Sequence, residues 1–580
     1  MSARKRDALA PSIAQALSGA TLVECLRWRE RAPETMAFWV ESLDEPCVAA
    51  TAGQLLQRAA RAAQGMAELG LGPRQRAMIV LPTGADFVYT FWGALVGGAT
   101  PVPAYPPVGL HQLDVFRERL ARMAALVDAR LIVVPEVLRS VLTADGEPAA
   151  NGTTMVTPEE IWKAAGRRER VVMPPAEDDL ALIQFSSGST GDPRAVCLTH
   201  RNILANMRAF VARMRLRADD LCVSWLPLYH DMGLIGTMMG SLLSNTQLVL
   251  IPPTDFLRRP IFWLQMMGKY RATASVAPQF AYNLCVRKAN ADELTDVDLS
   301  PLRVLLNGAE PIDAAGVAAF QRKFRSLGLR PGVVTPCYGL AEGTLAATMQ
   351  SPGQRVRTKA APISARNGKR SSTKVACVGP PMNDTEVRIR DPRGTWQEDG
   401  QVGEICLRGP SVSTGYLGTG GVKATLDPDG WLATGDLGFL HRGELFVTGR
   451  LKDLIIIGGR NLYPHEIEAA AAEVPGLRPG RVAALGVTAP ERATEALVLL
   501  AEFTAGSATA AATAAALRQQ LRARFGVLPH DIVLLPRGQV PLTTSGKLRR
   551  AQARADYERG GFHDALYRAR VPVGPRRAPV

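Results

Sequence analysis

"IQFSSGSTGDPRAVCLTHRN", Ile183 to Asn202, carries three serines, two threonines and two glycines in a short stretch. The apolar run Leu180–Phe185 leads into it and "AVCLTH" leads out, so the pattern predicts two strands joined by a loop. Such a loop can point successive backbone N–H groups at one anion while its hydroxyls hydrogen-bond phosphate oxygens. We therefore predict a phosphate-binding loop over 184–194. A flexible hairpin without a function is the alternative.

The sequence lacks two other common motifs, one for binding nucleotide phosphates and one for a catalytic serine. No GxxxxGK[ST] pattern occurs, and the nearest candidate, "TSGKL", has Pro541 where that motif needs its first glycine. There is also no GxSxG pattern, which argues against a serine hydrolase. The loop is therefore neither a Walker A loop nor a nucleophile elbow.

Residues 50–350, on both sides of this loop, alternate short branched apolar runs with amphipathic helical stretches. This alternation predicts mainly parallel sheets covered by helices, and thus an α/β fold. The expected strands are Arg76–Pro82, Ala129–Pro135, Leu221–Pro227, Gln247–Pro252 and Arg303–Gly308, and two expected helices are Gln54–Leu69 and Asp114–Leu126.

The chain is too long for one simple core, so we expect a large domain and a smaller one. The larger domain spans 1–449, and short strands between turn residues over 375–449 predict a barrel-like antiparallel part within it. Residues 450–453 form the predicted boundary, and 454–570 repeat a short α/β pattern. The proline-rich, basic tail 571–580 is expected to be disordered.

Composition is that of a soluble globular protein, with 47% hydrophobic and 21% charged residues. The uncharged runs Phe87–Leu110 and Met232–Thr254 are broken by glycine, proline or asparagine, so we expect buried helix–strand units and no transmembrane segment. No apolar leader precedes Glu24, and no two of the eight cysteines are closer than 22 residues. A cytoplasmic location without zinc clips or disulfides is the expectation.

The formal net charge is +14, with lysine and arginine spread along the chain and some excess at the extreme C-terminus. No helix-turn-helix, zinc-finger or RNA-binding pattern accompanies this charge, so nucleic acid is not a predicted partner. The charge would also suit a strongly acidic protein partner.

Four further stretches follow the loop in a specific order. They are "WLPLYHDMGLIG" (Trp225–Gly236), "CYGLAEGTL" (Cys337–Leu345), a stretch from "WLATGDLGFL" to "LYPHEIE" (Trp431–Glu468), and "PLTTSGKLRR" (Pro541–Arg550). Together with the loop, over about 25–550, they resemble the adenylate-forming superfamily of acyl-CoA synthetases, luciferases and nonribosomal adenylation domains. The resemblance implies a large domain, a small mobile lid domain, and activation of a carboxylic acid by ATP.

A narrower resemblance is to the fatty acyl-AMP ligases, through "PVPAYPP" (Pro101–Pro107), "YGLAEGTL" and "GRLKDLIIIGGRNLYPHEIE". Ala341 precedes Glu342, where CoA-forming relatives usually have threonine. The polar segment 351–373 lies where these ligases have an insertion, although it could be a long surface loop. The sequence departs from many superfamily members at Pro193-Arg194-Ala195, where a Pro-Lys-Gly is common, and this leaves the loop conformation open.

The resemblance implies ATP and Mg²⁺ as cofactors. It assigns the β- and γ-phosphates to Ser186, Ser187, Gly188, Ser189, Thr190 and Gly191; Mg²⁺ to Glu342; adenine to Tyr338 beside Gly339, with Asn307, Gly308 and Ala309; the ribose to Asp436; and ribose or phosphate to Arg450. The alternatives are a helix-start carboxylate for Glu342, core packing for Tyr338, and a surface ion pair for Asp436 with Arg450.

The acid-activating step is assigned by resemblance to Lys547, which would neutralise the carboxylate and the α-phosphate as they meet. Lys547 could instead belong to a solvated basic cluster. His230 would stand at the mouth of the acyl site, or be a core histidine. Lys452 takes the position of the interdomain hinge. The expected acyl tunnel is lined by Met232, Gly233, Ile235, Met239, Phe280 and Tyr282, although a methionine-rich face more often belongs to the core.

The leading hypothesis is a fatty acyl-AMP ligase that transfers its acyl group to the phosphopantetheine thiol of an acidic acyl carrier protein. No GxDS attachment site occurs in the chain, so the carrier would act in trans. If segment 351–373 hinders the CoA-using arrangement, its deletion should raise acyl-CoA output. An acyl-CoA ligase of the same fold is the first alternative, and a non-catalytic lipid- or nucleotide-sensing relative is the second.

Overall fold

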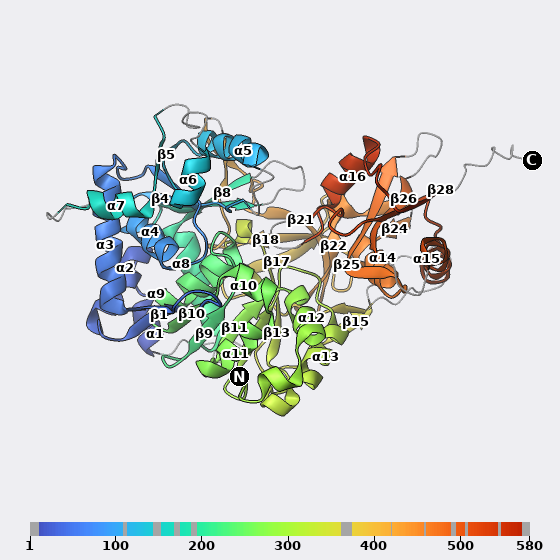
Figure 1. Cartoon of the computed structure of the whole chain (residues 1–580), viewed down its shortest axis with the longest axis horizontal. Coiled ribbons are helices and arrows are strands. Elements are labelled where there is room, and N and C mark those ends of the chain that lie inside the picture. Colours follow the sequence, from blue (N-terminus) through green and yellow to red (C-terminus); the bar gives the residue numbers. More distant parts are fainter. Residues whose placement is uncertain are drawn as a thin grey trace, which may run out of the picture.

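The structure is a computed structural model that describes residues 11–107, 113–142, 152–166, 174–186, 194–360, 374–418, 420–457, 460–488, 495–504, 509–542 and 547–570. The predicted phosphate-loop residues 187–191, most of the predicted insertion (361–373) and the tail 571–580 lie outside this description. A large α/β body holds the first three quarters of the chain, and a smaller α/β unit packs beside it (Figure 1). The predicted fold class is therefore confirmed.

The largest sheet has eight strands in the order β14-β13-β12-β11-β9-β10-β1-β2. Its central strands, from β13 to β10 and on to β1, are parallel, whereas β14 and β2 pair antiparallel at the two edges. The strands are β1 (Met36–Val40), β2 (Val48–Thr51), β9 (Leu221–Ser224), β10 (Gln247–Leu250), β11 (Ala274–Ala277), β12 (Val304–Asn307), β13 (Val334–Gly339) and β14 (Ala346–Met349).

Helices connect these strands and cover the sheet. These helices pack against the apolar faces of the sheet, as expected for a parallel sheet that is covered by helices. The helical segments of this part are α1 (Pro11–Ala16), α2 (Leu22–Arg27), η2 (Trp28–Arg31), α8 (His200–Met214), η4 (Met232–Met239), α9 (Gly240–Leu243), α10 (Pro253–Arg258), α11 (Ile261–Lys269), α12 (Gln279–Lys288), η5 (Ala291–Leu294), α13 (Ala314–Lys323), η6 (Arg325–Leu327) and η7 (Ala341–Gly343).

A second, fully parallel sheet has the order β4-β3-β5-β6. Its strands are β3 (Arg76–Ile79), β4 (Thr100–Pro103), β5 (Ala129–Val133) and β6 (Thr154–Val156), and its helices are α3 (Ala52–Glu68), α4 (Ala85–Val96), α5 (Leu113–Leu126), α6 (Glu136–Leu142) and α7 (Pro158–Ala164). Both predicted helix–strand units are present, as α4 followed by β4 and as η4 and α9 followed by β10.

The opening stretch folds as the two predicted strands, β7 (Leu180–Ser186) and β8 (Arg194–Thr199), which pair antiparallel. Ser186 and Arg194 are partners in this pairing, so the two ends of the predicted phosphate loop lie side by side. Thr199 then caps α8, because its hydroxyl accepts the N–H of Asn202 at 3.1 Å. β19 (Gly415–Gly418) and β20 (Gly421–Ala424) extend this sheet beyond β8.

The predicted barrel-like region folds as a four-stranded antiparallel sheet in the order β17-β18-β21-β22. These strands are β17 (Glu386–Arg390), β18 (Gly403–Arg408), β21 (Leu432–His441) and β22 (Glu444–Arg450). The hairpin of β15 (Thr358–Ala360) and β16 (Lys374–Ala376) lies next to it, joined through the Cys377–Phe446 bridge.

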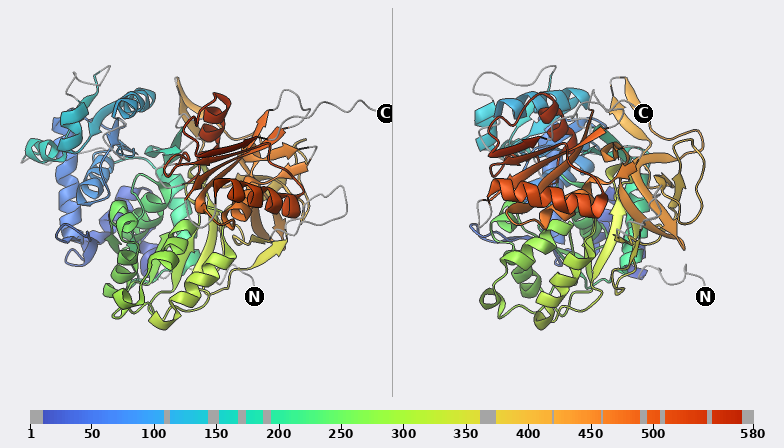
Figure 2. Two further views of the ribbon diagram at one scale, coloured as in Figure 1. Left: turned by 45° about the vertical axis from the view of Figure 1, so that its right-hand side comes forward. Right: turned by 90° about the vertical axis from the view of Figure 1, so that its right-hand side faces the viewer.

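The C-terminal unit follows η8 (Leu451–Asp453) and has its own hydrophobic clusters, drawn only from residues 455–569. Its sheet has the order β25-β26-β27-β28 and is visible on its edge in Figure 2. The elements are β23 (Ile455–Ile457), β24 (Arg460–Leu462), α14 (Pro464–Ala472), β25 (Leu477–Thr488), β26 (Glu495–Phe503), α15 (Ala510–Phe525), β27 (Asp531–Leu535), α16 (Arg550–Glu558) and β28 (Tyr567–Arg570). These clusters begin at Ile455, and the boundary at 450–453 stays a prediction.

Within the described ranges, no helix combines the length and the apolar character needed to cross a bilayer. All eight cysteines are free thiols.

Candidate active site

Four neighbouring parallel strands of the large sheet end at the same edge, and each is followed by a predicted site segment. The order β13-β12-β11-β9 places together the residues after Gly339, Asn307, Ala277 and Ser224. Ligands of open α/β sheets bind in crevices at the carboxyl ends of strands. Sheet topology therefore gathers motifs that lie more than a hundred residues apart into one candidate site.

The predicted adenine-binding segment follows β12 directly. Asn307 is fully buried, and its Nδ2 donates to Oε1 of Gln279 at 2.7 Å. A Cβ at Gly308 would lie 2.8 Å from Sγ of Cys337, and Ala309 has a φ of 65°, a left-handed conformation that costs energy for a residue other than glycine. The segment is thus held tightly, with its backbone pressed against β13.

The predicted adenine and ribose residues form one hydrogen-bonded chain. The Tyr338 hydroxyl donates to Oδ2 of Asp436 at 2.8 Å, and Nε of Arg450 donates to Oδ1 of the same carboxylate at 2.9 Å. Asp436 is 6% exposed and pairs across β21 and β22 with Arg450. The carboxylate of Asp436 is buried between an aromatic ring and a guanidinium group. The Asp436–Arg450 contact is therefore not an ion pair between two exposed side chains.

Gly339 continues this chain toward the predicted metal ligand. A Cβ there would lie 1.6 Å from the carbonyl oxygen of Leu345, so only glycine fits this approach. The chain then turns through η7, which carries Glu342.

Glu342 faces the base of the predicted phosphate loop. Its Oε1 accepts the Tyr416 hydroxyl at 2.7 Å, and the Ser186 hydroxyl lies 3.5 Å from the same oxygen. The guanidinium carbon of Arg194 lies 5.3 Å from the centre of the Tyr416 ring. One described end of the loop, Ser186, therefore lies beside Glu342, and the other, Arg194, lies over Tyr416, which binds Glu342. The loop residues Ser187, Gly188, Ser189, Thr190 and Gly191 are outside the described part of the chain.

His230 and Asp231 lie after β9 and form a close pair, with Nδ1 of His230 2.6 Å from Oδ1 of Asp231. The carboxylate also accepts the backbone N–H of Met232 at 2.7 Å. Burial raises the pKa of Asp231, but the contact with His230 and the charge of Lys547 more than offset burial, so its pKa lies below the ordinary value. His230 is about one-third exposed and is not a core residue.

Lys547 comes from the C-terminal unit and lies over this edge of the sheet. Burial lowers the pKa of Lys547, although the carboxylates of Glu310 and Asp231 lie close enough to oppose that effect, and the charge of Arg450 adds to it. Glu310 in turn accepts the backbone N–H of Phe280 at 2.9 Å. Lys547 is thus half-buried and close to charged groups of the large body, and is not fully solvated.

The predicted acyl wall consists of two buried segments. Met232, Gly233, Ile235 and Met239 lie on η4, a wide π-helix of a kind often found at functional sites. The half-buried Phe280 ring lies 5.8 Å from Trp225.

Tyr282, predicted for the same wall, is completely buried. Its hydroxyl donates to the carbonyl of Leu306 at 2.7 Å, and its ring packs edge-on against Phe320. These are contacts of a core residue, and a role of Tyr282 in the acyl wall stays a prediction.

Three residues of the site were not predicted from the sequence: Tyr416, Glu310 and Asp231. Asp231 stood within the "YHDMG" motif beside His230, and Glu310 followed the predicted adenine segment, so both had a local signal. Tyr416 had none, because it reaches Glu342 only through the pairing of β19 with β8.

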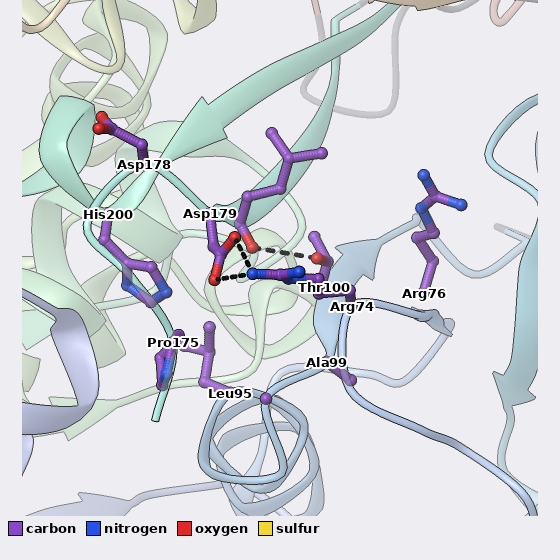
Figure 3. A pocket seen from close by; sticks show the side chains of 11 residues that line it. Arg74, Arg76, Leu95, Ala99, Thr100, Pro175, Asp178, Asp179 and His200 are labelled. Atoms are coloured by element: carbon purple, nitrogen blue, oxygen red, sulfur yellow. Dashed lines mark hydrogen bonds and ion pairs between the residues drawn. The ribbon is translucent and has the colours of Figure 1, made fainter. Parts of the chain in front are cut away.

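A pocket of about 250 Å³ lies elsewhere, at the starts of β3, β4 and β7 (Figure 3). Arg74 and Asp179 form an ion pair across it at 3.2 Å, and burial lowers the pKa of the adjoining His200 to about 4. The opposite end of β4 leads to Tyr105, whose ring lies 6.2 Å from that of Tyr229, next to the candidate site. This pocket is therefore separate from the candidate active site.

Comparison with known proteins gives the family. The family model for AMP-binding enzymes matches residues 26–417. The chain belongs to the AMP-binding enzymes. A long-chain-fatty-acid–AMP ligase of Mycobacterium marinum is 34% identical over 550 residues, covering 88% of this chain and 92% of the relative. A 4-hydroxyphenylalkanoate adenylyltransferase of the same organism is 32% identical and covers 84% of this chain and 82% of its own length.

Solved structures agree with the sequence relatives of this AMP-binding enzyme. One comes from a study of fatty acyl-adenylate ligases from E. coli and L. pneumophila and superposes with a TM-score of 0.85 at 31% identity, covering 94% of this chain and 99% of the other. A fatty acyl-adenylate ligase from L. pneumophila in complex with acyl adenylate and pyrophosphate gives 0.71 at 28% identity, with 97% and 99% coverage.

Proposed function

We propose that the chain is a fatty acyl-AMP ligase that activates a medium- or long-chain fatty acid. A carboxylate oxygen attacks the α-phosphorus of ATP, the bond to the β-phosphate oxygen breaks, and acyl-AMP and pyrophosphate form. The observation that carries the proposal is the buried Tyr338–Asp436 hydrogen bond at the carboxyl end of the sheet, with Arg450 on the same carboxylate and the charge of Lys547 nearby. The relatives named for fatty acids and acyl-adenylates support the choice of substrate.

Charge is the obstacle to this reaction, because a carboxylate must approach a polyanion. Lys547 is a point charge on a flexible stem and would neutralise both anions as they meet. Asp436, buried beneath Tyr338, offers two acceptor oxygens for ribose hydroxyls, and Arg450 fixes its orientation. His230 would stand between this centre and the acyl wall of η4, and rotation at Lys452 would move the lid after the first step.

Mg²⁺ fits the residues present. Glu342 offers a carboxylate beside Ser186, and hard cations prefer oxygen ligands. In the described part of the chain, no three His, Cys, Asp or Glu side chains are grouped as metal ligands. Glu342 would therefore hold the ion together with phosphate oxygens and water, and the ion would supply positive charge to the phosphates.

Glu342→Gln keeps the shape of the side chain but removes its charge. We expect the apparent affinity for Mg²⁺ to fall by about tenfold or more, because an amide oxygen is a weaker ligand than a carboxylate. The measurement is acyl-AMP formation against free Mg²⁺ at fixed ATP. Tyr416→Phe, which removes only the hydroxyl donor on the same oxygen, is the control with a smaller expected shift. An unchanged Mg²⁺ dependence in the glutamine variant would refute this role.

The proposed acceptor is the phosphopantetheine thiol of an acidic acyl carrier protein acting in trans, in the cytoplasm. Carrier proteins are acidic, and a chain of net charge +14 favours such a partner.

The predicted insertion bears on this choice of acceptor. Its stem is the β15–β16 hairpin, which is fixed to the neighbouring sheet by the Arg357–Glu444 ion pair and by Lys359, whose Nζ lies 3.1 Å from Nε2 of His441. We propose that the segment 351–373 restricts the lid and so disfavours CoA.

Replacing 361–373 by a two-glycine turn is a clean deletion, because Ala360 and Lys374 are already partners in the hairpin. We expect acyl-CoA formation to rise while acyl-AMP formation stays within about twofold of the parent. Both products are measured with fatty acid, ATP and CoA present. Acyl-CoA output that does not rise would count against the restriction of CoA by this segment.

The test of the function as a whole is a series of fatty acids of increasing length, assayed for acyl-AMP with and without CoA. Acyl-AMP accumulation in both conditions supports the proposal. Abundant acyl-CoA from the unmodified chain would instead favour an acyl-CoA ligase, and absence of acid-dependent pyrophosphate exchange would favour a non-catalytic relative.

A further inference from the structure

Arg550 begins α16, three residues after Lys547, and its guanidinium group binds two carboxylates at once. Nε and Nη2 bind Oε1 and Oε2 of Glu468 at 2.8 and 2.6 Å, and Nη1 lies 3.0 Å from Oδ2 of Asp453. All three side chains are at most 23% exposed. Bidentate, partly buried arginine–carboxylate contacts fix geometry far better than exposed ion pairs do.

The two carboxylates come from different places. Glu468 lies on α14 inside the C-terminal unit, and its Oε1 also accepts the backbone N–H of Ala484 at 3.0 Å, so this contact holds the unit together. Asp453 is the last residue of η8 and directly follows the predicted hinge residue Lys452. Arg550 therefore connects the hinge segment to the helix that follows Lys547.

The backbone next to Lys547 is fixed as well. Leu542 and Leu548 form an antiparallel bridge, and the N–H of Arg549 donates to the carbonyl of Pro541 at 2.9 Å. A displacement of Arg550 consequently also displaces Lys547, because the two residues are only three positions apart and this bridge holds the backbone between them.

Asp453 also lies near the nucleotide residues. Its charge, together with the larger influence of Asp436, raises the pKa of Arg450, the residue that orients Asp436. Asp453 thus binds Arg550 and lies close enough to Arg450 for its charge to act there, so charged groups of the predicted ribose site, the hinge segment and the helix after Lys547 lie close together.

We propose that Arg550 is a positioning residue for acyl-AMP formation. Its contact with Asp453 makes the hinge segment and the Lys547 loop move as one unit, so that rotation at the hinge brings the ammonium group to the reacting anions. The inference rests on the proposed role of Lys547. Its physical basis is that a displacement of about 1 Å at a reacting group can cost about a hundredfold in rate.

The test is Asp453→Asn, which removes the charge at the hinge and leaves the Arg550–Glu468 contact intact. We expect kcat for acyl-AMP formation to fall by about tenfold or more, with KM for ATP and fatty acid changed by less than about twofold. The melting temperature should stay within about 2 °C. The matched control is Arg554→Gln on the same helix, which breaks the 3.6 Å pair with Glu495 but leaves Asp453 and Glu468 unchanged, and it should leave kcat within about twofold.

A double-mutant cycle separates positioning from a general defect of the lid. In a Lys547→Ala background, measured under single turnover with enzyme in excess, Asp453→Asn should cost less than about twofold, because no ammonium remains to be positioned. Equal losses in both backgrounds, an equal loss from Arg554→Gln, or no loss in the parent would overturn the inference. If Lys547→Ala alone leaves the rate unchanged, the proposed catalytic role fails, which is a distinguishable result.

Discussion

Replacing Lys547 with alanine is expected to lower the rate of acyl-AMP formation by about two to three orders of magnitude, the effect of removing one well-placed charge from a reacting centre. The ammonium group lies near the charges of Glu310, Asp231 and Asp436, and in the proposed mechanism it neutralises the carboxylate and the α-phosphate together. The loss should appear mainly in kcat, because the charge that Lys547 neutralises develops as the two anions join.

The measurement is pyrophosphate release with saturating ATP and fatty acid. Arg549→Ala, two residues away in the same basic motif, is the control and should stay within about twofold of the parent. Acyl-AMP formation that continues undiminished in Lys547→Ala would remove the basis of the proposed mechanism.

The pKa of Lys547 predicts the alkaline limb of the pH–activity profile, the range in which activity falls as pH rises. Burial lowers the pKa of Lys547 from its ordinary value of 10.5, and the proposed mechanism requires the ammonium form. The kcat/KM of the free enzyme should therefore fall as pH rises through a value below 10.5. Lys547→Arg, which stays protonated, should lose this limb, and a limb that persists in the arginine variant would assign it to another group.

The largest effect on stability is expected from Arg29, which contacts α9, the helix directly after η4. It is 1% exposed, and its guanidinium group donates to the carbonyl oxygens of Leu242, Ser241 and Thr246 at 2.8, 3.2 and 2.6 Å. These carbonyls end α9 and lead into β10, so the cation also meets the negative end of a helical segment. Burial lowers the pKa of Arg29 to about 10.

Arg29→Met fills part of the space but leaves these buried carbonyl oxygens without their donor. Each unsatisfied group costs about 1–3 kcal/mol, so we expect a loss of about 4 kcal/mol and a drop of about 4 °C in melting temperature. Arg27→Met, on the exposed side of the preceding helix, is the matched control and should change the melting temperature by less than about 1 °C. Equal melting curves for the two variants would contradict this role of Arg29.

Local patterns predicted the elements well where one face or one segment is buried. The alternation of apolar runs predicted β3, β5, β9, β10 and β12, because short branched runs favour strands inside a covered sheet. The glycines and prolines within the two uncharged runs predicted their division into helix and strand. The order of the motifs then predicted the family. Each motif is one contiguous stretch, so it can be recognised in the sequence without knowing which residues surround it in space.

Contacts between distant segments were beyond this kind of inference. Tyr416 reaches Glu342 across 74 residues, and Arg550 reaches Asp453 across 97. The sequence alone contains no signal for either, because each contact depends on which strand edges pair and on where the C-terminal unit packs.

The sequence by itself therefore determined the fold class, the family and the residue types of the site, because periodicity and motifs are local properties of the chain. Only the tertiary structure decided which of these residues meet. It buried Asp436 under Tyr338, placed Tyr416 on Glu342 and linked Asp453 to the helix that follows Lys547. The physical reason is that the order of parallel strands gathers their carboxyl ends at one edge of a sheet, and this order is set by packing over the whole chain.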